Sequence, residues 1–111
     1  LDLSKRDTSP AMQSYADLTE FIIRYPESEY IDAARERLIF LRNLIASSEL
    51  DGAEYYMKRG AYLAAANRAN YVLKNIPNST ERERALRILK EAYKQLGYDE
   101  YAEKISSFET N

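Results

Sequence analysis

The chain has 111 residues, with 16 basic and 18 acidic side chains and a formal net charge of −2. It contains neither histidine nor cysteine, which removes the usual general base near neutral pH, the thiol nucleophile and the common transition-metal ligands. A near-neutral charge disfavours nucleic-acid binding, since that binding depends on Lys and Arg neutralising phosphates. We therefore expect a protein that is not an enzyme and has no metal, cofactor or nucleic-acid partner. No apolar stretch approaches the roughly 20 residues of a membrane span, and no signal peptide is expected in this sequence.

Apolar residues recur at helical spacing through the first half of the chain. Ser9-Pro10 favours a helix start with Ser9 as the capping residue, and Pro26 disfavours helix at the residue before it. Residues 28–58 carry an apolar spacing of three and four that continues without a slip up to residue 45. We interpret them as one long helix, or as two helices with a kink near Ser47 to Gly52. A helix of about 30 residues spans roughly 45 Å, which is ordinary in a helical array.

Three further helices are expected in the second half. Gly60 suits the C-terminal cap of the long helix, and Gly97 suits the same role later in the chain. One amphipathic helix lies between Gly60 and Pro77. Thr80, followed three residues later by Glu83, matches a capping box that would begin the next helix. A short last helix follows Gly97, and no strand pattern persists, so the expected fold class is all-α.

The spacing of these elements indicates a repeat. Gly60 and Gly97 are 37 residues apart, close to the roughly 34 residues of a tetratricopeptide repeat (TPR). Tyr56 and Tyr93 each lie four residues before a glycine, where the first helix of a TPR carries its large aromatic residue. Ala65 supplies the small residue that lets two helices approach closely. We expect a TPR-like helical hairpin array, an α-solenoid of about five helices, with a plain helical bundle as the alternative.

The repeat divides the chain into three units. Residues 1–27 would be the second helix of a truncated repeat, residues 28–77 a lengthened repeat and residues 78–111 the final repeat. Pro26 and Pro77 are 51 residues apart, and the long helix would account for this excess over the usual period of about 34 residues.

Several stretches resemble one known family. They are the segments 25–30 (YPESEY), 37–42 (RLIFLR) and, most specifically, 53–62 (AEYYMKRGAY), which continues to Ala66-Asn67-Arg68. These segments resemble the BamD family, also called YfiO or ComL, of outer-membrane assembly lipoproteins. The resemblance implies that residues 1–111 are the C-terminal TPR half of such a protein. The signal peptide, the lipid-bearing cysteine and the N-terminal repeats of the family are missing from this sequence.

The resemblance also implies a function. It predicts a non-catalytic protein–protein interaction scaffold of the β-barrel assembly machine, the BAM complex, which inserts outer-membrane proteins. The implied partners are the membrane-proximal POTRA domain of BamA and the other BAM lipoproteins. The implied location is the periplasmic face of the Gram-negative outer membrane, reached through a lipid anchor absent from this sequence. Three alternatives stay open: a groove for extended peptides of unfolded barrel clients, a periplasmic TPR module with a Tol–Pal-type partner, and a small helical enzyme.

Exposed aromatic and arginine side chains are the candidates for partner binding, because these residue types dominate binding hot spots. Arg68 is the first choice: no acidic residue lies three or four positions away, so its guanidinium could bind a partner's carboxylate. The resemblance places the family's Asn67-Arg68 pair on the BamA-docking repeat. Arg59 and Tyr62 flank the first glycine turn, and Tyr98 lies beside the second. The alternatives are charge compensation at a helix end for Arg59, and a solvated or interhelix-paired Arg68.

Overall fold

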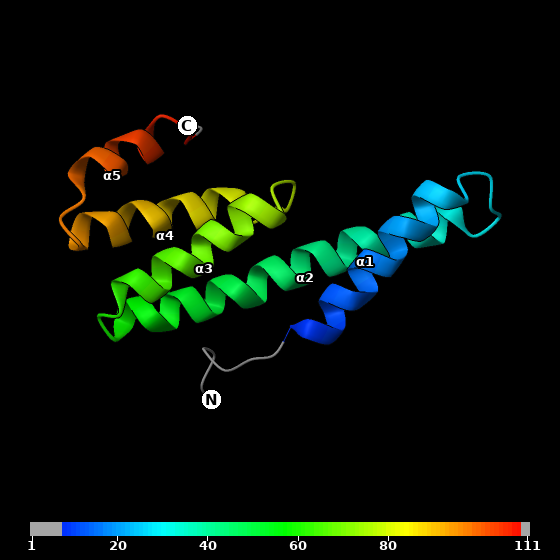
Figure 1. Ribbon diagram of the computed structural model, residues 1–111, viewed down its shortest axis with the longest axis horizontal. Coiled ribbons are helices and arrows are strands. Elements are labelled where there is room, and N and C mark those ends of the chain that lie inside the picture. Colours follow the sequence, from blue (N-terminus) through cyan, green and yellow to red (C-terminus); the bar gives the residue numbers. More distant parts are fainter. Residues whose placement is uncertain (1–7, 110–111) are drawn as a thin grey trace.

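The computed structural model describes residues 8–109 as an array of helices (Figure 1). No strand occurs in this range, and each helix packs against the next along the chain. The expected all-α, TPR-like array is confirmed. None of the helices in residues 8–109 has the combined length and apolarity needed to cross a membrane. The five helices are α1 (Ser9–Arg24), α2 (Ile31–Lys58), α3 (Tyr62–Asn75), α4 (Arg82–Gln95) and α5 (Asp99–Ser106).

The long helix α2 is unbroken over 28 residues. It begins after Ser28, whose Oγ accepts a hydrogen bond from the N–H of Tyr30 at 3.1 Å in the preceding turn. The kink considered near Ser47 to Gly52 does not form. Leu50 and Gly52 belong to the continuous helix and are buried in the protein. Figure 1 shows α1 along the first half of α2 and α3 along its second half.

Helix α1 ends at Arg24, before Tyr25 and Pro26, as the proline predicts. Its start differs from the prediction: Thr8 occupies the cap position, Ser9 is already helical, and no side chain caps the helix. None of its residues is fully buried. It packs against the core through partly buried side chains, which include Ala11, Met12 and Tyr15.

The core lies where α2, α3 and α4 meet. Alanine at the crossings lets these helices approach closely, and larger aliphatic side chains fill the space between them. Ala65 is completely buried, in keeping with its expected place where two helices approach closely. The buried core cluster contains Ile45, Ala46, Leu50, Ala53, Ala66, Ala69, Val72, Ile76, Ala85, Ile88, Leu89 and Ala92.

The two glycine turns have the same construction. Gly60 and Gly97 have φ angles of 76° and 80°, in the left-handed region that a residue without Cβ adopts at little cost. The N–H after each glycine donates back to the carbonyl of Tyr56 or Tyr93, at 2.9 and 2.8 Å. This is the Schellman pattern of helix C-termini. The predicted capping role of both glycines is confirmed.

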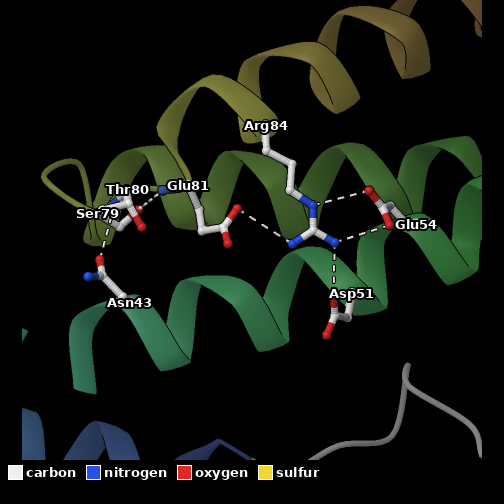
Figure 2. Close-up of polar contacts among 7 residues, drawn as sticks. All are labelled: Asn43, Asp51, Glu54, Ser79, Thr80, Glu81 and Arg84. Carbon is white, nitrogen blue, oxygen red and sulfur yellow. Dashed lines mark hydrogen bonds and ion pairs between the residues drawn. The ribbon is translucent and has the colours of Figure 1, made fainter. Parts of the chain in front are cut away.

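The capping box predicted at the start of α4 is wrong. Glu81 occupies the cap position, and no side chain caps α4. The backbone N–H of Thr80 donates instead to Asn43 Oδ1 of α2 at 3.0 Å, and Ser79 Oγ accepts from the N–H of Glu81 at 3.2 Å (Figure 2). The loop between α3 and α4 is thus tied to α2, because a partner on another helix has replaced the local cap.

Candidate functional site

A hollow of about 360 Å³ opens between α2 and α3. The hairpin folded at Gly60 creates it, because the turn brings the end of α2 antiparallel to α3. We call it the α2–α3 hollow. Its lining residues are Glu49 and Tyr56 from α2, and Ala64, Asn67, Arg68 and Tyr71 from α3.

Arg68 contacts two side chains of α2. Its Nη1 lies 3.4 Å from Glu49 Oε2, and its guanidinium carbon lies 5.7 Å from the centre of the Tyr56 ring. Charge-assisted N–H···O bonds usually measure about 2.7–2.9 Å, so this ion pair is long. The side chain of Arg68 remains 23% exposed. Arg68 is therefore paired between helices, as one sequence alternative held, and its guanidinium still borders the hollow.

Glu49 connects the hollow to the start of α1. Thr8 Oγ1 donates to Glu49 Oε1 at 3.1 Å, and nearby Tyr71 donates its hydroxyl to Met12 Sδ at 3.6 Å. Burial, followed by the negative charge of Glu49, raises the pKa of Tyr71 above its usual value. Two residues that line the hollow, Glu49 and Tyr71, are thus each hydrogen-bonded to a residue at the start of α1.

The other candidate residues near the first glycine turn, Asn67, Arg59 and Tyr62, lie within ten residues of Arg68 in the sequence. Asn67 lines the hollow beside Arg68. Arg59 caps the end of α2, is exposed, and lies with its guanidinium carbon 5.6 Å from the centre of the Tyr55 ring. Tyr62 begins α3 and packs partly against the core.

Tyr98 lies apart from the hollow, at the turn between α4 and α5. It is 47% exposed, and its ring centre lies 6.3 Å from that of Tyr93 and 6.0 Å from that of Tyr101. Figure 1 places this turn and the α2–α3 turn at the same end of the array. The structure therefore puts all the sequence candidates at this end or on the adjoining hairpin.

Sequence reasoning missed Glu49, and it gave Tyr56 only as the large aromatic residue of the repeat's first helix. Spacing rules within one helix could not find the partner of Arg68, because Glu49 lies on the preceding helix. The sequence did contain a signal for this partner. In a helical hairpin that turns at Gly60, residues at similar distances before and after the glycine along the chain face each other, as Glu49 and Arg68 do.

A second polar cluster joins α4 to α2 (Figure 2). Arg84 Nη2 lies 2.8 Å from Asp51 Oδ1, its Nε donates to Glu54 Oε1 at 3.1 Å, and its Nη1 lies 3.6 Å from Glu81 Oε2. The hydrogen bond with Glu54, above all, and that with Asp51 raise the pKa of Arg84 against the opposing effect of burial. This Arg84 cluster fixes the relative position of two helices.

The chemistry open to the α2–α3 hollow is recognition by shape and charge. Across residues 8–109, no group of acidic side chains is arranged to hold a metal ion. A guanidinium beside an aromatic ring is suited to bind a carboxylate.

The YfiO family, described as an outer membrane lipoprotein, matches residues 1–108 of this chain. The outer membrane protein assembly factor BamD of Xylella fastidiosa is 42% identical over 97 residues, which cover 87% of this chain and 33% of that protein. Its counterparts from Vibrio cholerae and Neisseria meningitidis are 35% and 39% identical and are covered over 43% and 38% of their lengths. The chain thus spans about a third to two fifths of these relatives. It belongs to the YfiO (BamD) family of outer membrane lipoproteins.

Proposed function

We propose that this chain is the docking part of an outer membrane protein assembly factor and works as a non-catalytic scaffold. Its relatives carry the name of such factors, and stacked helical hairpins commonly bind other chains through their grooves and helix ends. The proposed location is the periplasmic face of the outer membrane, with a lipid anchor outside residues 1–111. The proposed partners are the membrane-proximal POTRA domain of BamA and the accessory lipoproteins of the machine.

Arg68 in the α2–α3 hollow is the observation that carries this proposal. Its guanidinium borders an open hollow, contacts Glu49 over a long 3.4 Å and lies near the ring of Tyr56. One guanidinium can serve more than one carboxylate, as Arg84 does in this same chain. In the proposed complex, Arg68 binds a carboxylate of the POTRA domain.

The remaining candidates extend this contact. Asn67 lies in the hollow and offers an amide to the partner's backbone. Arg59 and Tyr62 flank the adjoining turn and would contact the rim of the same partner. Tyr98, exposed at the same end of the array, is proposed to contact an accessory lipoprotein.

Calorimetric titration with a purified POTRA segment of a cognate BamA, at two salt concentrations, tests the proposal. Arg68→Gln should weaken binding at least tenfold, or about 1.4 kcal/mol, and should reduce its salt dependence. Glutamine is preferred to glutamate, because a second carboxylate beside the largely buried Glu49 would also destabilise the fold. Arg87→Gln, on the exposed face of α4, is the matched control. An unchanged affinity for Arg68→Gln would remove Arg68 from the site.

A peptide-binding groove is the second candidate. An apolar hollow of about 550 Å³ lies on α1, where Ile23 is 75% exposed. A large exposed aliphatic side chain suits contact with an unfolded apolar segment. Titration with C-terminal peptides of barrel proteins would test this function: Ile23→Ser should abolish binding, while Arg68→Gln should not affect it. The lining residues are Tyr15, Ala16, Thr19, Glu20, Ile23 and Arg24.

A further inference from the structure

Glu49 presents its carboxylate to the same guanidinium that the proposed docking would use. We propose that Glu49 is an internal competitor: its carboxylate competes with a partner's carboxylate for the guanidinium of Arg68. This competition lowers the affinity of the α2–α3 hollow for an acidic partner, so that only a partner whose carboxylate binds Arg68 strongly is retained. This inference rests on the proposed function, in which Arg68 binds a partner's carboxylate.

The carboxylate of Glu49 has a neighbour at each of its two oxygen atoms. Oε2 faces Arg68 at 3.4 Å, and Oε1 accepts from Thr8 at 3.1 Å. The side chain of Glu49 is only 12% exposed. A partner's carboxylate that reaches Arg68 must therefore come close to a second negative charge that water screens poorly. Like charges so placed weaken the approach of the partner.

The long contact argues against a role for Glu49 in aiming Arg68. In this chain Arg84 meets Asp51 at 2.8 Å, the length of a well-formed charge-assisted bond, which is about 2.7–2.9 Å. Arg68 meets Glu49 at 3.4 Å and has the Tyr56 ring as a second neighbour. Removal of the Glu49 charge would leave that aromatic contact in place.

The competition implies a chemical requirement for the partner. Arg68 and Glu49 give the hollow one positive and one negative side chain, so a single weak acceptor gains little there. An aspartate or glutamate that forms two parallel bonds to the guanidinium gains enough to compete. The geometry thus points to a partner carboxylate that binds in a bidentate manner.

The test compares two neutralising substitutions on one helix. Glu49→Gln keeps the size of the side chain and its acceptor for Thr8 but removes the charge. Glu36→Gln, at an exposed position of α2, makes the same change in net charge and is the matched control. Calorimetric titration with the POTRA segment should show binding three- to tenfold tighter for Glu49→Gln and unchanged for Glu36→Gln. Glu49→Asp, which withdraws the charge by one methylene, should give a smaller gain and serves if the glutamine variant melts early.

The outcomes separate this inference from the function on which it rests. If Arg68→Gln weakens binding but Glu49→Gln also weakens it, Glu49 positions Arg68 and the competitor role is overturned. If Glu49→Gln and Glu36→Gln behave alike, the role is likewise overturned. If the unchanged chain does not bind and Glu49→Gln does, the competitor role is supported. If neither binds, both the docking function and the competitor role are overturned.

Discussion

Arg84 of α4 approaches Asp51 of α2 to 2.8 Å, although α3 separates these two helices in the chain. The contact joins two helices that also share the buried hydrophobic core with α3. The arginine side chain is 20% exposed and also meets Glu54 and Glu81. This cluster therefore holds α4 to α2 directly, and not only through α3.

Arg84→Met should lower the free energy of unfolding by about 2 kcal/mol, because it leaves partly buried carboxylates without their cation. Urea denaturation followed by circular dichroism would measure the loss. Arg82→Met is the control, since Arg82 is more exposed and lies 3.8 Å from Glu83. Equal losses for the two variants would show that the Arg84 cluster has no special weight.

Asn43→Ala should loosen the loop between α3 and α4. The substitution removes the acceptor for the Thr80 N–H, and one exposed hydrogen bond is worth about 0.5–1 kcal/mol. Hydrogen exchange at the Thr80 amide should accelerate severalfold, with no change at amides in the middle of α2. Unchanged exchange at Thr80 would mean that this bond does not form in solution.

Gly60→Ala should cost about 1 kcal/mol of stability, because φ at this residue is 76°. A Cβ at this position would meet no atom within 4 Å, so the cost comes from the backbone conformation alone. Gly60→Asn should cost less, since asparagine tolerates the left-handed region better. Thermal denaturation of both variants would measure the difference, and a neutral alanine variant would contradict the Schellman assignment.

Tyr71 should make the free energy of unfolding fall as the pH rises into the alkaline range. Its pKa is raised in the folded state, first by burial and then by Glu49, so the folded chain keeps this proton where the unfolded chain loses it. The stabilisation is complete below the usual pKa of about 10 and is lost as the pH rises through the folded-state value. Tyr71→Phe should therefore lose less stability than the unchanged chain between pH 9 and 11. Urea titrations at several pH values would show whether the two slopes differ.

The sequence predicts those features that local chemistry determines. The helix ends at Gly60 and Gly97 are predictable because the hydrogen bonds that close these turns join residues only five positions apart in the chain. The end of α1 is predictable because the ring of Pro26 itself disfavours helix at the preceding residue. The start of α4 is mispredicted because Thr80 finds its partner on Asn43, which is 37 residues away. The identity of the residue that pairs with Arg68, Glu49, is missed for the same reason: the contact exists only after the hairpin has closed.

The unbroken course of α2 has a mechanical consequence. The helix has 28 residues, or about 42 Å at 1.5 Å per residue, and it packs against α1 along one half and against α3 and α4 along the other. A sharp kink between these halves would require the loss of backbone hydrogen bonds in a continuous helix. A displacement of the end of α2 that packs against α1 would therefore move the end at the Gly60 turn with it, so α2 behaves as one rigid element.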